Sequence, residues 1–143
     1  MFAGVAPFSI VIAKNSKAKK VVSNEINREA NKYAKLNVEL NKVKVELVSG
    51  NVKKIKLKQK FDVIVMPRPR LKDTFLKEAF SLSKKGTRIY YYDFCNIEDL
   101  DKIVDKVKDE AKKAKKKIKI LSKRKAGEIA PYKIRARIDI KLL

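Results

Sequence analysis

The sequence contains no histidine and no tryptophan, and it has a single cysteine, Cys95. The absence of histidine excludes imidazole acid–base catalysis and histidine-ligated metal sites, and we expect no bound metal. One cysteine cannot form an internal disulfide. Because Cys95 has no histidine to deprotonate it, we expect a core thiol rather than a nucleophile. A lone thiol fits a reducing, cytoplasmic setting.

Acidic residues and long apolar runs are also scarce. The chain has 37 Lys and Arg against 16 Asp and Glu, a formal net charge of +21. This excess favours a polyanionic partner, chiefly a nucleic acid, through counterion release. A Lys-rich solvated surface is the alternative interpretation. No apolar run approaches roughly 18 residues and the N-terminus lacks the basic flank of a signal peptide, so we expect neither a membrane span nor export.

The first half of the chain alternates between strand and helix patterns. The length of 143 residues predicts a single domain over 1–143. Helices are predicted at 8–15, at 27–41 and at 71–86, the last ending at Gly86. Strands are predicted at 21–23, at 42–50 and at 60–67, where a continuous apolar run indicates burial on both faces. On the helix at 27–41 the predicted apolar side comprises Ala30, Tyr33, Ala34, Leu36 and Leu40.

The second half continues the alternation and then changes. A strand at 87–95 and a helix at 97–117 precede two strands, 118–121 and 132–143, joined by a loop at 122–131. Along the last strand, apolar and charged residues alternate, which predicts one buried face. The buried set is Ile134, Ala136, Ile138 and Ile140. The whole pattern predicts an α/β fold whose mostly parallel sheet ends in an antiparallel hairpin.

Ligands of such sheets bind beyond the carboxyl ends of the strands. The small-residue turn "FAGVAPF" lets the main chain approach a nucleoside closely. Glu25 lies at the end of the second strand of such a fold, which is predicted here at 21–23, and it can accept hydrogen bonds from both ribose hydroxyls. Asn51 can bind an adenine edge. The rigid "MPRPR" loop can support a planar substrate. We expect the segments around Phe2, Glu25, Asn51 and Pro67 to converge on one nucleoside-sized hollow.

These segments, with "NREANKYAKLNVELNKV" and "YYDF", resemble the catalytic domain of the archaeal and eukaryotic tRNA (guanine-37 N1)-methyltransferase family. The resemblance covers nearly the whole chain. It implies a Rossmann-like class I methyltransferase fold, S-adenosylmethionine as the cofactor and N1-methylation of guanine 37 in tRNA. The sibling wybutosine aminocarboxypropyltransferase transfers a different group from the same cofactor and is one alternative. A degenerate methyltransferase fold kept as an RNA-binding module is another.

The resemblance also implies roles for individual residues. It places Glu25 at the ribose, Asn51 at the adenine, and further cofactor contacts at Phe2, Ala3, Gly4, Ala6, Pro7 and Phe8. It places Pro67, Arg68 and Pro69 in the pocket of the target base. Contacts to tRNA are expected from the basic residues Arg70, Lys123, Arg124, Lys125, Arg135 and Arg137.

Three departures from the family pattern bear on these roles. Ala6 stands where the family usually has a second glycine, which is tolerated if its φ stays negative. Asn51 replaces a usual Asp and weakens the expected adenine contact. Pro67 lacks the side-chain amide of the family motif, and Arg68 could take over by binding the O6 and N7 edge of guanine.

The chain begins at the turn that follows the first strand of this fold. That strand, which would lie between the strands carrying Glu25 and Met66, is apparently missing. Each unsatisfied main-chain group on the exposed strand edges would cost about 1–3 kcal/mol. We therefore expect a truncated sequence, a strand from a second polypeptide or upstream segment, or direct closure of the two neighbours.

The general base and part of the tRNA grip are expected upstream of this chain. Asp62 begins a predicted strand, and Asp93 is as readily a structural acid, so neither is a convincing base. The catalytic residue is therefore unassigned.

Overall fold

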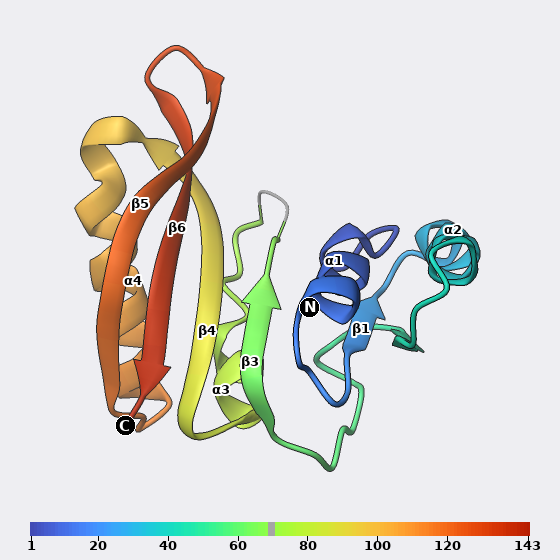
Figure 1. Ribbon diagram of the computed structural model, residues 1–143. Helices are drawn as coiled ribbons and strands as arrows, with labels where there is room; N and C mark the ends of the chain where they lie inside the picture. Colours follow the sequence, from blue (N-terminus) through green and yellow to red (C-terminus); the bar gives the residue numbers. More distant parts are fainter. Residues whose placement is uncertain (69–70) are drawn as a thin grey trace. The chain divides into compact units, whose positions relative to one another are not determined.

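A computed structural model describes residues 1–68 and 71–143, which fall into two units, Met1–Lys56 and Leu57–Leu143 (Figure 1). The single domain expected over 1–143 stays a prediction.

The first unit pairs two short parallel strands with two helices. Its elements are α1 (Pro7–Asn15), β1 (Val22–Glu25), α2 (Arg28–Leu40) and β2 (Glu46–Ser49). Proline at the first position of α1 is preorganised for a helix, and the Asn27 side chain caps α2 by accepting from the Glu29 and Ala30 amides. The register pairs Val22 with Glu46 and Glu25 with Ser49, so the carboxyl ends of both strands lie together.

The core of the first unit is small. Ala6, Ile10 and Ala34 are buried in it, with partly buried Val38, Val43 and Leu47 packed around them. The predicted apolar side of α2 is therefore largely wrong, because Tyr33, Leu36 and Leu40 are exposed by 58%, 52% and 79%. Only the stripe through Ala34 and Val38 reaches the core.

The second unit is a four-stranded mixed sheet with helices on one face (Figure 1). Its strands are β3 (Phe61–Met66), β4 (Ser83–Asn96), β5 (Ile118–Ala130) and β6 (Lys133–Leu142), in the order β3-β4-β6-β5. β3 runs parallel to β4, whereas β6 runs antiparallel to both β4 and β5. The helices are α3 (Leu76–Ser81) and α4 (Leu100–Lys113), the latter preceded by a 3-10 turn at Ile97–Asp99.

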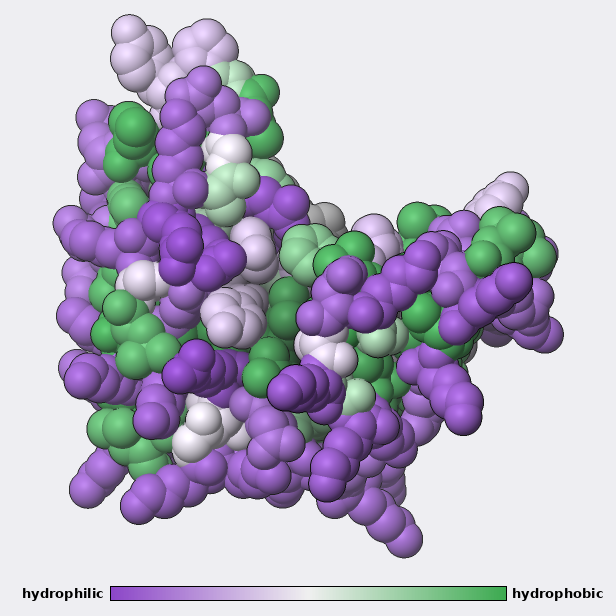
Figure 2. Space-filling model, viewed as in Figure 1, coloured by the Kyte–Doolittle hydropathy of each residue, from purple (hydrophilic) through white to green (hydrophobic). Residues whose placement is uncertain are grey.

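The core of the second unit lies between this sheet and its helices. The four residues of the last strand that the alternation placed inward, Ile134, Ala136, Ile138 and Ile140, are all buried. α4 contributes Ile103, Val104, Val107 and Ala111. The other face of the sheet is mainly hydrophilic over β5 and β6 (Figure 2).

Three predicted elements of the second unit need correction. The helix predicted at 71–86 is only Leu76–Ser81, because β4 already begins at Ser83 and includes Gly86. The loop predicted at 122–131 is mostly strand, since β5 continues to Ala130. β3 is covered on one face only: Ile64 and Met66 are buried, but Val63 is 49% exposed.

The strands form two sheets, and each sheet has an open edge. Among the described residues, β1 pairs only with β2 and β3 pairs only with β4. On its other side, β1 accepts one hydrogen bond from the opening turn, from the Ala3 amide to the Asn24 carbonyl at 3.0 Å. No helix within 1–68 or 71–143 is long and apolar enough to span a membrane. The same residues contain no cluster of three or more side chains that could hold a metal ion.

Candidate active site

The carboxyl end of β1 presents Glu25 against the opening turn. Its Oε2 accepts a hydrogen bond from the Gly4 amide at 2.8 Å, and its Oε1 accepts one from the Asn27 amide at 2.9 Å. Gly4 has φ +55°, and a Cβ there would meet no atom within 4 Å, so open space adjoins this main chain. A carboxylate offers about four acceptor positions. Glu25 can therefore still accept hydrogen bonds from two hydroxyl groups of a ligand.

The carboxyl end of β2 is held beside Glu25 by main-chain and amide hydrogen bonds. The Gly50 amide donates to the Glu25 carbonyl at 2.8 Å. The side-chain amide of the buried Asn24 donates to the carbonyls of Val48 and Gly50, both at 2.9 Å. Sequence reasoning missed Asn24, whose only signal was a polar residue at the end of a predicted strand.

Asn51 directly follows Gly50, whose amide and carbonyl form hydrogen bonds to β1. Its Oδ1 accepts from the Lys53 amide at 3.0 Å, and its carbonyl accepts from the amides of Lys54 and Ile55, which closes a turn. The Asn51 side chain is thereby oriented at the end of β2. Its amide nitrogen can donate to an adenine ring nitrogen, whereas its oxygen is already used by the turn.

The opening turn differs from expectation at Ala6. Its φ is +68°, not negative, so the alanine adopts a left-handed conformation that favours glycine. The Ala6 methyl is fully buried in the core, whereas the Phe8 side chain is 40% exposed. Of the six predicted cofactor contacts in this turn, the structure brings the main chain of Ala3 and Gly4 to β1 and Glu25.

In the second unit, Arg68 follows β3 and is fully buried. One terminal nitrogen donates to Asp93 Oδ1 at 2.7 Å. The other donates to the carbonyls of Leu71 at 2.7 Å and Asp73 at 2.5 Å, and the guanidinium lies 5.6 Å from the centre of the Tyr91 ring. One terminal nitrogen of Arg68 is thus engaged by β4 and the other by the loop, and the expected contact of Arg68 with a guanine edge stays a prediction.

Asp93 is a structural acid. Besides Arg68 it accepts hydrogen bonds from the Tyr91 hydroxyl at 2.8 Å, the Phe94 amide at 2.9 Å and Lys106 at 3.5 Å. Burial, together with the neighbouring Asp93 charge, raises the pKa of Tyr91 and keeps the phenol protonated. The network ties the loop after β3 to β4.

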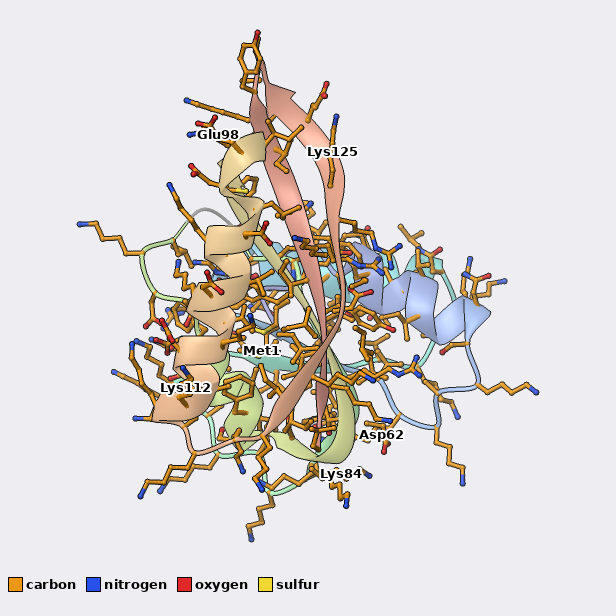
Figure 3. The ribbon with its side chains drawn as sticks, turned by 90° about the vertical axis from the view of Figure 1, so that its left-hand side faces the viewer. Met1, Asp62, Lys84, Glu98, Lys112 and Lys125 are labelled. Carbon is orange, nitrogen blue, oxygen red and sulfur yellow. The ribbon has the colours of Figure 1, made fainter. Side chains whose placement is uncertain are left out.

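Two other residues with acid–base or nucleophilic chemistry offer no catalytic group. Burial raises the pKa of the half-buried Cys95 thiol, and the nearby carboxylates Asp93 and Asp99 raise it further, so the nucleophilic thiolate is disfavoured. Asp62 is exposed and pairs with Lys84 at 2.7 Å, which lowers its pKa (Figure 3). The general base stays unassigned.

Most of the basic residues expected to contact tRNA are already paired. Arg137 binds both oxygens of Asp139 at 2.7 and 2.8 Å, and Arg124 binds the same carboxylate at 3.0 Å. Lys123 pairs with Asp101, and Lys125 with Glu128. Arg135 instead stacks over the Tyr92 ring at 4.7 Å. Arg70 and Pro69 lie outside the described residues, and the tRNA contacts stay a prediction.

Residues 1–121 match the family model of the TRM5/TYW2 methyltransferase domain. The chain belongs to this family. It is 36% identical over 99% of its length to the tRNA (guanine(37)-N(1))-methyltransferase Trm5b of Pyrococcus abyssi, and it spans 42% of that protein. The crystal structure of the Pyrococcus Trm5b superposes with a TM-score of 0.88.

Two further TRM5/TYW2 structures are similar. The M. jannaschii TYW2 in complex with AdoMet has a TM-score of 0.92 at 28% identity, over 99% of this chain and 66% of that one. A complex of aTrm5 and tRNALeu has a TM-score of 0.81 at 29% identity, over 100% of this chain and 40% of that one. The Rossmann-like methyltransferase fold expected from the sequence is thus confirmed.

The first unit suits the adenosine part of the cofactor of the TRM5/TYW2 family. Glu25 keeps two acceptor positions beside Gly4, and both Gly4 and Gly50 leave open space next to their main chain. A shallow hollow elsewhere in this unit, lined by Lys14, Val21 and Lys44 among others, lies at the amino ends of β1 and β2 and is not this site. Pro67, half-buried after β3, belongs to the second unit, and its convergence with Glu25 stays a prediction.

Proposed function

We propose that the chain is the S-adenosylmethionine-binding part of a cytoplasmic enzyme that methylates N1 of guanine 37 in tRNA. The observation that carries the proposal is the carboxylate of Glu25, held 2.8 Å from the Gly4 amide where the ends of β1 and β2 meet. Membership of the TRM5/TYW2 family and the activity named for the Trm5b relative support it. The tRNA complex of a relative supports tRNA as the partner.

The residues of the first unit would bind and orient the cofactor. Glu25 accepts hydrogen bonds from the two ribose hydroxyls, and Asn51 donates to the adenine ring. The glycine turn around Gly4 admits the nucleoside close to the main chain because no Cβ intervenes. When bound, S-adenosylmethionine supplies an electrophilic methyl group for transfer to a ring nitrogen.

We further propose that a strand from an upstream segment or a second polypeptide covers the open edges of β1 and β3. The hydrogen bond from the Ala3 amide to the Asn24 carbonyl shows that an acceptor on the open side of β1 can be paired. The same additional polypeptide would supply the general base and the rest of the tRNA grip. The length of the Trm5b relative, of which this chain spans 42%, supports the proposal.

Titration calorimetry with S-adenosylmethionine tests the cofactor site. We predict that Glu25→Gln weakens binding about 10- to 100-fold, because each hydrogen bond to a charged group contributes roughly 1.5–3 kcal/mol. Glu46→Gln is the matched control: Glu46 lies in β2 of the same unit and pairs with Lys20 on the surface. It should bind like the wild type. Absence of binding heat from folded wild-type protein at millimolar ligand would defeat the proposal.

Aminocarboxypropyl transfer is the second candidate, favoured by Pro67, which has no side-chain amide for a guanine edge. The two reactions leave different products when tRNA is incubated with this chain and the proposed additional polypeptide. Methyl transfer releases S-adenosylhomocysteine, whereas aminocarboxypropyl transfer releases methylthioadenosine.

A further inference from the structure

The turn between β5 and β6 has an unusual residue in a strained position. The turn consists of two residues, Pro131 and Tyr132. The proline ring fixes its own φ near about −65°, and Tyr132 follows with φ +60°. A turn of this kind favours Gly or Asn at its second central position. A tyrosine in the left-handed region is strained, because its Cβ lies too close to the main chain.

Packing of the Tyr132 side chain does not offset this strain. Its side chain is 82% exposed, more than any other large hydrophobic residue among those described. The main chain, in contrast, is anchored, because the Tyr132 carbonyl accepts a hydrogen bond from the Ile97 amide at 2.9 Å. The fold thus holds an aromatic ring in solvent at a fixed place. Strain without a packing gain is typical of functional positions.

The surroundings of Tyr132 select the kind of partner. The hairpin 118–142 contains eight basic and two acidic residues, a net charge of +6. Its connecting turn projects beyond the sheet, and Lys125 lies on the projecting part (Figures 1 and 3). An exposed ring among cations is the arrangement by which proteins bind unpaired bases: the charges hold phosphates and the ring stacks on a base. An apolar protein surface would have to desolvate those charges.

We propose that Tyr132 is a stacking platform for an unpaired RNA base, presented by the β5–β6 hairpin. The proposal rests on the proposed function in one respect, that the partner is RNA. It goes beyond that function because the match to the family model ends at residue 121, before the turn. It also adds a residue that charge alone could not reveal.

Binding of a fluorescently labelled tRNA transcript to the full chain, measured by anisotropy at several salt concentrations, tests the proposal. Tyr132→Ala should weaken binding about 5- to 100-fold, since stacking on one aromatic ring contributes roughly 1–3 kcal/mol. Tyr132→Phe keeps the ring face and should bind within about twofold of the wild type. The salt dependence should not change, because no charge is removed.

Two further variants separate recognition from folding. Tyr132→Gly should lose as much affinity as Tyr132→Ala, yet melt at the same temperature as the wild type or higher, because glycine relieves the turn. Ile129→Ala removes another exposed apolar side chain of the same hairpin, 53% exposed, and should leave RNA binding unchanged.

The outcomes that overturn the proposal are specific. Wild-type affinity in Tyr132→Ala, equal losses in the Phe and Ala variants, or no RNA binding by the wild-type chain would each do so. Methyl transfer is measured separately, on this chain together with the proposed additional polypeptide. If transfer is absent while RNA binding depends on the Tyr132 ring, the proposed activity fails and the stacking role stands.

Discussion

Arg68 and Asp93 form a buried ion pair on which the loop after β3 depends. Their side chains are 0% and 7% exposed, and the pair also holds two loop carbonyls, the Tyr91 hydroxyl and the Phe94 amide. A buried pair contributes little over an apolar replacement, because desolvation offsets the attraction. Removing one partner is different, since it leaves the other charge buried and uncompensated.

We predict that Arg68→Met destabilises the protein by about 3–5 kcal/mol. Adding Asp93→Asn should recover a large part of this, because the side chain then carries no charge, its oxygen can still accept from the Phe94 amide, and its NH2 group can donate to the Tyr91 hydroxyl oxygen. Urea unfolding measures both. Lys84→Met is the control: its pair with Asp62 is 50% and 84% exposed, and the change should cost at most about 1 kcal/mol. Simple additivity of the two core substitutions would contradict the prediction.

Single residues of the site were predictable to different degrees. Glu25 and Gly4 could be found because strand ends and small-residue turns leave local sequence signals. The role of Arg68 could not, because its partner Asp93 is 25 positions away and only the fold brings them together. The positive φ of Ala6 was equally hidden, since a local pattern does not fix one dihedral angle.

At the scale of elements, the prediction of each helix and strand was as accurate as its pattern of apolar residues was regular. α4 was predictable because four apolar residues at helical spacing pack on the sheet. The length of α3 was overestimated. The Asp73 and Thr74 side chains accept hydrogen bonds from the Phe75 and Leu76 amides, so the helix begins later than predicted. β5 was underestimated because its charged residues suggested a loop, whereas cross-strand pairing keeps them in the sheet.

The β5–β6 pair is linked across strands by Asp139. Burial alone would raise the pKa of this carboxyl, but hydrogen bonds from Arg137 and Ser122 outweigh burial and lower the pKa. The charged form is thus favoured by folding. Its contribution to stability is complete above the unfolded-state pKa of about 3.9 and is lost as the pH falls through the lower folded-state value.

We therefore predict that the free energy of unfolding falls with acidification below about pH 4, and that Asp139→Asn reduces this dependence. Denaturant unfolding at several pH values measures it. Asp105→Asn removes an exposed carboxylate of α4, and that variant should keep the acid dependence of the wild type. An unchanged pH profile in Asp139→Asn would refute the assignment.

At the scale of the whole molecule, the alternation of strands and helices was enough to predict the α/β class. The described residues form two sheets with open edges at β1 and β3, and the additional strand stays a prediction. The exposed stripe of α2 was not predictable, because an apolar helix face gives no information on whether a partner for it lies within the same chain.

We predict that polypeptide supplying the proposed strand slows amide hydrogen exchange in β1 and β3. The free edges gain hydrogen-bond partners, whereas β5 and β6 are already paired and should exchange as before. Exchange with mass-spectrometric detection, with and without the upstream segment, measures the change. Unaltered exchange in both edge strands would argue against the proposal.

The short connection at Pro131 and Tyr132 also has a kinetic consequence. β5 and β6 are neighbours along the chain, so their pairing closes a minimal loop at little entropic cost. The parallel pair β1 and β2 can form only after α2 has crossed between them. Because local contacts form faster than distant ones, we expect the C-terminal hairpin to form before the parallel pairs β1–β2 and β3–β4. Because β6 lies between β4 and β5, the sheet of the second unit becomes continuous only when residues 133–142 are available for pairing.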